Sequence, residues 1–80
     1  MAKSVHTNRH KLVASALAAQ RRAMGMTQAE VARALGRHQP FIANIESGER
    51  RVDLVELLDI ADIIKLDVPA LVAEIQAVKG

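Results

Sequence analysis

The segment GRHQPFIANIESG, from Gly36 to Gly48, carries the side chains of this 80-residue chain that are best suited to recognising another molecule. Its pattern predicts a short helix between two glycines, in which Ile42 and Ile45 share one face at about 100° per residue. Side-chain amides donate and accept hydrogen bonds, and Gln39 opens this helix. The face opposite the isoleucines is small and polar, which leaves room for close approach by a large partner; it is formed by Pro40, Ala43, Asn44 and Ser47.

Catalytic and metal-binding chemistry has little support in the sequence. The chain lacks cysteine, which removes disulfides, thiolate ligands and cysteine nucleophiles together. His6 and His10 have the spacing of two metal ligands on one helix, but no third ligand or intervening glutamate accompanies them. There is no nucleophile elbow, phosphate-binding glycine loop or carboxylate pair. We therefore expect no enzyme activity, no metal site, no cofactor and no small-molecule ligand.

Length and composition indicate one small all-α domain. A chain of 80 residues buries only about 60% of the surface that its unfolded form exposes, so a second copy could add useful stability. Half of the residues are apolar but Phe41 is the single aromatic, so the core must be built from aliphatic side chains, many of them good helix formers. No apolar run approaches the roughly 20 residues of a membrane span, and Met1 to Lys11 lacks the apolar stretch of a secretory signal. A cytoplasmic protein without a membrane partner is expected.

The charge is divided unevenly along the chain. Residues 1–52 hold nine lysines and arginines against three glutamates, a net charge of +6, whereas residues 53–80 hold two against six, a net charge of −4. Such a division favours a basic end that meets a polyanion and an acidic end that does not. Charges that merely coat solvated faces are the alternative explanation.

Five helices that position these residues can be predicted from caps, breaks and apolar spacing. Residues 1–9 are expected to form a flexible basic arm, and residues 10–80 a single domain. The helices are expected over about 10–24, from the capping box of Thr27 and Glu30 to Gly36, over the stretch described above, from Asp53 to about 66, and from Asp67 onward. The side chains expected to face the core on the first, second and fourth helices are Val13, Ala16, Leu17, Met24, Val31, Ala32, Leu35, Leu54, Leu57, Leu58, Ala61 and Ile64.

Only GRH separates the second and third helices, so the two must cross sharply. Residues 17–64 also contain, in order, Arg21 before Gly25, then MTQAEVA, LGRHQ, IESGER and DIA. This linked set resembles the phage-repressor and Cro type of helix-turn-helix domain, often called XRE-like. The resemblance implies a five-helix lambda-repressor-like DNA-binding domain, with a helix-turn-helix formed by the second and third helices, in a bacterial or phage-encoded protein.

The resemblance also implies which residues contact double-stranded DNA. Gln39 matches the base-reading position that opens the third helix, where an amide can bond adenine in the major groove, and Asn44 lies a turn further on. Pro40 and Ala43 share that face. Gln28, at the start of the second helix, matches a glutamine that grips phosphate at a helix amino end. Further phosphate contacts are expected from Thr27, Arg37, His38, Ser47, Arg50 and Arg51.

Four other positions are interpreted differently. Arg21 and Glu46 match a structural ion pair of the family that supports the third helix. Phe41 is expected to pack. His38 stands where the family usually places a capping serine or threonine and is a poor cap; a cationic imidazole could instead meet a phosphate, which would strengthen binding at lower pH.

These expectations combine into a sequence-specific transcriptional regulator, a repressor by default, that binds a near-palindromic operator as a homodimer. The fifth helix carries an apolar stripe that either forms the dimer surface or packs in the core, made by Leu71, Val72, Ile75 and Val78. The alternative function is a protein-interaction adaptor, or a toxin-binding antitoxin, built on the same fold.

Overall fold

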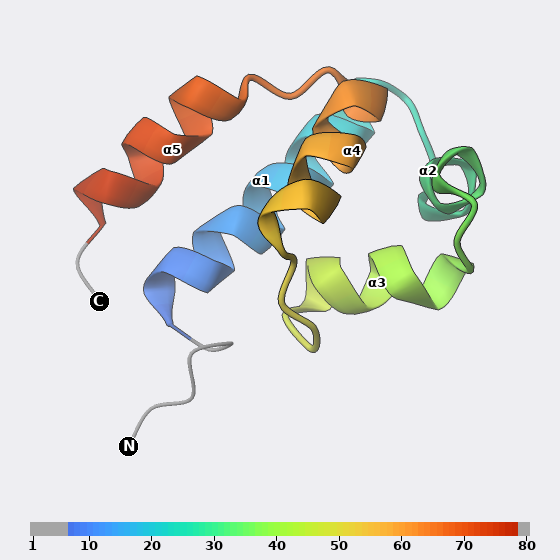
Figure 1. Cartoon of the computed structure of the whole chain (residues 1–80), viewed down its shortest axis with the longest axis horizontal. Helices are drawn as coiled ribbons and strands as arrows, with labels where there is room; N and C mark the ends of the chain where they lie inside the picture. The colour runs from blue at the N-terminus through green and yellow to red at the C-terminus, as the bar shows by residue number, and fades with distance from the viewer. Residues whose placement is uncertain (1–6, 79–80) are drawn as a thin grey trace.

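The computed structural model describes residues 7–78, and within this range the chain is all-α, with five helices and no strand (Figure 1). The predicted fold class is therefore confirmed. The helices are α1 (Asn8–Ala23), α2 (Gln28–Leu35), α3 (Gln39–Ser47), α4 (Leu54–Ile64) and α5 (Val68–Ala77).

Side-chain caps explain where most of these helices begin. Capping boxes start α2 and α4. The Thr27 and Asp53 side chains each accept a hydrogen bond from the backbone N–H three residues on, and the Glu30 and Glu56 side chains accept one from the backbone N–H of Thr27 and Asp53. Helix α1 begins at Asn8, two residues before its expected start, because the Thr7 hydroxyl accepts from the His10 N–H. Asn8 and Arg9, which were expected in the arm, therefore belong to its first turn. Residues 1–6, with His6 among them, lie outside the described residues.

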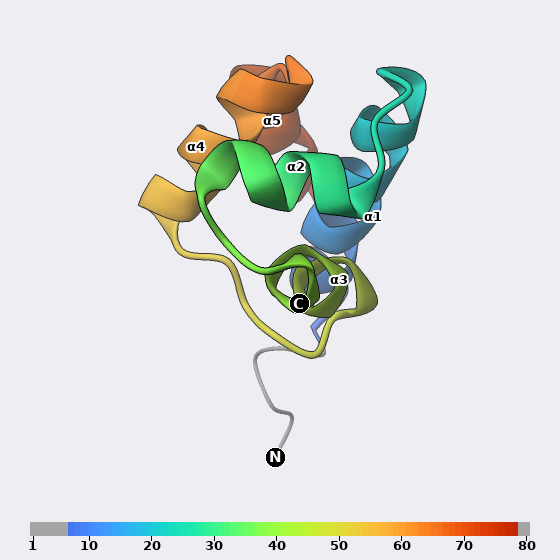
Figure 2. The same ribbon diagram turned by 90° about the vertical axis from the view of Figure 1, so that its right-hand side faces the viewer.

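The helix-turn-helix is made by α2 and α3. Gly36 ends α2 with φ of 72°, a left-handed conformation that a glycine adopts without strain, and the chain enters α3 three residues later. Figure 1 shows α2 nearly end-on while α3 lies across the page, and Figure 2 reverses the two views, so the helices cross steeply. This crossing places α3 at the edge of the molecule.

The core lies where α1, α2, α3 and α4 meet, and α5 closes one end of it. Figures 1 and 2 both show α5 on the side of the molecule away from α3. The Arg9 side chain ties the start of α1 to the end of α5, since its Nε donates to the Val78 carbonyl oxygen at 2.8 Å. The main cluster of buried apolar residues comprises Leu17, Val31, Ala32, Ile42, Ile45, Leu57, Ile60, Ile64 and Leu71.

Several core expectations were wrong on α1 and α4. Met24 is exposed at the end of α1, and Leu54 and Leu58 are exposed on α4, whereas Ile60 was not expected and is buried. The reason is that α4 is apolar around most of its circumference, so periodicity alone does not define its buried stripe. Packing selects the stripe, which runs through Leu57, Ile60, Ala61 and Ile64.

No helix within residues 7–78 is long and apolar enough to cross a membrane.

Candidate nucleic-acid interface

The outward face of α3 is the surface expected to read DNA. Gln39, Pro40, Asn44 and Ser47 are exposed, and Ala43 is half-buried beside them. On the opposite face, Ile42 and Ile45 are buried in the core, which fixes the rotation of the helix about its own axis. The structure therefore brings the expected base-reading residues together on one exposed face.

His38 precedes this face as the N-cap residue of α3, and its side chain makes no capping hydrogen bond. Pro40 causes no loss at this end, because the first turn of a helix has N–H groups without intrahelical partners. The His38 side chain is exposed and stands at the entrance to the outward face. Its proposed contact with phosphate stays a prediction.

One flank of α3 is supported by Glu46. Arg21 on α1 binds it through two hydrogen bonds, from Nε to Oε2 at 2.7 Å and from Nη2 to Oε1 at 2.9 Å, and the two side chains are only 10% and 8% exposed. The remaining terminal nitrogen of Arg21 donates to the Met26 carbonyl oxygen at 2.8 Å. The ion pair expected from the sequence is present, and it joins α1 and the turn before α2 to α3.

Gln28 is also part of this support. Its Nε2 donates to Glu46 Oε1 at 2.9 Å, so the amide that was expected to bind phosphate is also bonded to the ion pair. The amide retains a second N–H and its oxygen, which leave it able to contact phosphate as well. Neighbouring Thr27 is engaged in the capping box, where its hydroxyl accepts from the Glu30 N–H. The phosphate roles of both residues stay predictions.

The pKa of Glu46 follows from these contacts. Burial alone would raise the pKa of this carboxyl, but hydrogen bonds from Arg21 and Gln28 and the nearby positive charges outweigh burial and lower it. The pKa of Glu56 is lowered as well, chiefly by its hydrogen bonds with Arg50. Both carboxylates therefore favour the folded state only while they are ionised.

We expect the free energy of unfolding to change little from pH 7 down to pH 5 and to fall as the pH drops further. The sign follows because a lowered folded-state pKa contributes stability above the unfolded value, about 4.3 for glutamate, and this contribution is lost on protonation. Urea denaturation between pH 7 and pH 3 measures it. The Glu46→Gln variant should lose less stability over the acidic range; an equal loss would contradict the role of this carboxyl.

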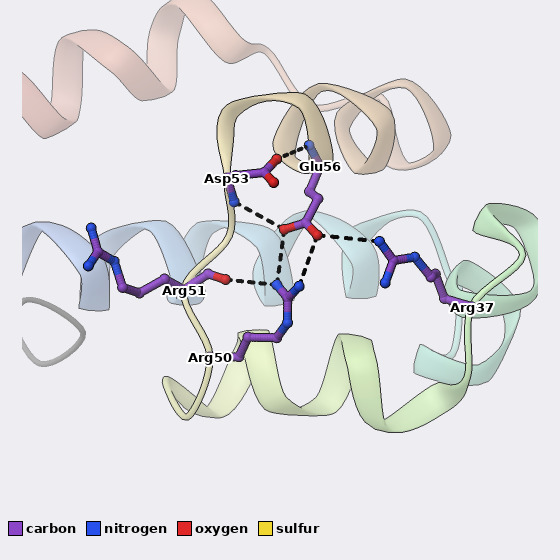
Figure 3. Close-up of polar contacts among 5 residues, drawn as sticks. All are labelled: Arg37, Arg50, Arg51, Asp53 and Glu56. Carbon is purple, nitrogen blue, oxygen red and sulfur yellow. Dashed lines mark hydrogen bonds and ion pairs between the residues drawn. The ribbon is translucent and has the colours of Figure 1, made fainter.

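The other flank of α3 carries a cluster that we call the arginine clamp, formed by Arg37, Phe41, Arg50 and Glu56. Figure 3 shows the polar contacts of its two arginines with Glu56. Arg50 binds the Glu56 carboxylate through two hydrogen bonds of 3.0 and 2.9 Å, and Arg37 Nη2 lies 3.4 Å from Glu56 Oε2. The two guanidinium carbons lie 4.2 Å (Arg37) and 4.7 Å (Arg50) from the centroid of the Phe41 ring. Cations over an aromatic face are attracted by its quadrupole. Phe41 thus packs between the core and the two arginines.

Sequence reasoning missed Glu56. Arg37 and Arg50 were assigned to DNA phosphates individually, without a shared partner on α4. The available signal was the spacing of Asp53 and Glu56, since the same spacing identified the capping box at the start of α2. That spacing indicates a cap only, and it does not reveal the contacts with arginines 6 and 19 positions away in the sequence. Arg51 is exposed in the same loop, and its carbonyl oxygen accepts from Arg50 Nη1 at 2.9 Å.

The apolar stripe of α5 is largely used inside the monomer. Leu71 is 2% exposed and belongs to the core, and Ile75 packs against the core from its edge. Of the two roles left open for this stripe, Leu71 takes the core role, because its side chain is buried against the other helices and is not exposed for a dimer surface. Val72 is exposed and Val78 is half-buried. The larger group of exposed apolar side chains lies on α4 and consists of Leu54, Val55 and Leu58.

A steeply crossed helix pair, with an exposed polar face on its second helix, defines the chain as a helix-turn-helix domain. Comparison with known proteins agrees: residues 12–75 match the helix-turn-helix domain family, and the chain belongs to that family. It is 36% identical to the XRE-family like protein from Pseudomonas syringae pv. tomato str. DC3000, with a TM-score of 0.81 over 92% of this chain and 90% of that chain. Its membership of the XRE family, a class of DNA-binding transcription regulators, follows from this match together with the family assignment.

A second solved structure is similar in fold. The clp gene regulator ClgR from Corynebacterium glutamicum superposes with a TM-score of 0.77 over 88% of this chain and 74% of that chain. At 20% identity this likeness supports the shared architecture alone. A comparison with curated proteins found no similar sequence.

Proposed function

We propose that this protein is a sequence-specific regulator that reads DNA with α3 in the major groove. The observation that carries the proposal is the outward face of α3, where the amides of Gln39 and Asn44 are exposed on a helix whose other faces are all held. The two isoleucines hold it from behind, Glu46 holds one flank, and the arginine clamp holds the other. A rigid helix with free amides can recognise base edges by hydrogen bonds of fixed geometry.

Phosphate contacts on the flanks would give this reader its affinity. Gln28 at the start of α2 adjoins one side of α3, while Arg37 and Arg50 lie at the other, and Arg51 is exposed in the loop that follows α3. Contacts of this type place a protein on the duplex without selecting its sequence. The residues of α3 itself include no lysine or arginine, so selectivity would come from uncharged side chains and affinity from the flanks.

We further propose that the regulator acts as a homodimer on a near-palindromic operator. Two copies would read half-sites about 10 base pairs, or roughly 34 Å, apart. The proposal is supported by apolar side chains that are exposed in the monomer and could be buried by a second copy. They are Leu54, Val55 and Leu58 on α4 and Val72 on α5. A bound dimer over a promoter would exclude polymerase, so repression is the expected direction of control.

The test combines selection with a salt titration. Sequences selected from random DNA should converge on a near-palindrome, and the complex with a selected duplex should contain two protein chains. Affinity should fall steeply with salt, by about 0.9 in log K per unit of log salt for each phosphate contacted. The same chain mixed with an unrelated duplex of equal length is the control.

Two outcomes would contradict the proposal. Failure of selection to enrich any sequence, with weak binding at low salt, would favour the adaptor alternative, in which the exposed residues of α4 bind another protein. Selection of an asymmetric site that binds one protein chain would support the sequence-specific regulator and contradict the homodimer.

A further inference from the structure

The arginine clamp joins both ends of α3 to one carboxylate. Arg37 precedes α3 and Arg50 follows it, and Glu56 on α4 accepts hydrogen bonds from both. Glu56 Oε1 also accepts from the backbone N–H of Asp53 at 3.1 Å, which fixes the carboxylate to its own helix. Figure 3 shows Glu56 reaching down from α4 between the two arginines. A single acid thereby connects the turn before the DNA-reading helix, the loop after it and α4.

The acid and the two arginines of the clamp differ in exposure. The Glu56 side chain is 14% exposed, whereas the Arg37 and Arg50 side chains are 48% and 39% exposed. The acid is recessed and the cations are outermost, so a polyanion approaching this flank meets positive charge first. The Phe41 ring, which belongs to α3, lies under both guanidinium groups. The position of the two arginines is therefore coupled to the position of α3 by direct packing.

We propose that Glu56 is a positioning residue for sequence recognition, which sets the orientation of α3 and the loop after it without touching DNA. This inference rests on the proposed function. Loose positioning of α3 would weaken hydrogen bonds to base edges, which demand exact placement, and would leave sequence-independent attraction to phosphate in place. Glu56 would therefore govern the ratio of specific to non-specific affinity.

The Glu56→Gln variant gives opposite signs for positioning and for simple electrostatics. Glutamine has nearly the same shape and can still accept the capping hydrogen bond, but it removes one negative charge beside DNA. If only the charge mattered, the affinities for the selected duplex and for non-specific DNA would both rise. Positioning expects the affinity for the selected duplex to fall about tenfold, within the range for losing one base contact, while non-specific affinity stays equal or rises.

A second variant and a control complete the experiment. Glu56→Asp keeps the charge but shortens the side chain, so it should also lower the ratio of specific to non-specific affinity. Glu49→Gln makes the same charge change in the exposed loop after α3, at the residue next to Arg50 that is not itself part of the clamp, and should not lower that ratio. Affinities are measured by fluorescence anisotropy with both duplexes, at a temperature where thermal melts show every variant to be folded.

The outcomes separate the two proposals. If the unmodified protein shows no preference for any sequence, the proposed function fails. If it shows a preference that Glu56→Gln and Glu56→Asp retain, the positioning role alone is overturned. A loss of both affinities by the same factor would assign Glu56 to folding and would likewise overturn it.

Discussion

Replacing Glu46 with alanine is expected to lower the free energy of unfolding by about 3–5 kcal/mol, the range for removing one partner of a buried ion pair. Arg21 would keep its charge in a nearly buried site with no carboxylate, and Gln28 would lose its acceptor. Each kcal/mol lowers the melting temperature of a domain this small by about 4–8 °C. Thermal and urea denaturation measure the effect directly.

Two comparisons isolate the cause of that loss. Glu49→Ala removes an exposed acid three residues away and should leave the melting temperature nearly unchanged. Joint replacement of Arg21 by methionine and Glu46 by leucine removes both charges, and it should recover much of the stability because apolar pairs often match a buried ion pair. An unchanged melting temperature for Glu46→Ala would refute the structural role of the pair.

The second large effect is expected at Gln39. Gln39→Ala should weaken binding to the selected duplex by about 1–3 kcal/mol, the discrimination carried by one bidentate contact with a base. Its side chain is exposed, so stability should hold, and non-specific affinity should change little. Repeating the selection with the variant should relax the preference at one base in each half-site.

Gln76→Ala is the matched control, because it removes the same amide from an exposed position on α5, on the side of the molecule away from α3. Its affinity for the selected duplex should equal that of the unmodified protein. Equal weakening by both variants, or undiminished binding by Gln39→Ala, would remove Gln39 from the reading face.

Local signals in the sequence were sufficient for the helix-turn-helix. The capping box at Thr27 and Glu30 and the glycines at 36 and 48 have short-range effects on the backbone, so they predict where α2 begins and ends and where α3 ends. The Arg21–Glu46 pair joins residues 25 positions apart and followed from the family resemblance. The helix ends could be predicted because caps and glycines act on neighbouring residues, and the ion pair could be predicted because the family shares it.

Other features depend on packing that no local pattern defines. Helix α4 is apolar on most of its surface, so the choice of Ile60 over Leu54 and Leu58 is made by the neighbouring helices. The role of Leu71 was left open between a dimer surface and the core for the same reason, since an apolar stripe suits a core and an interface equally. The arginine clamp requires three separate segments to meet at Glu56, and single-sequence reasoning had no means to bring them together.

The separation of α3 into a held side and an outward side has an evolutionary consequence. Ile42, Ile45 and Glu46 contribute to folding, whereas Gln39, Pro40, Asn44 and Ser47 are exposed and contribute little to it. Substitutions at the outward positions can therefore accumulate with little loss of stability. Gene duplicates of such a protein could diverge to new operators by changing a handful of codons while the scaffold stays constant.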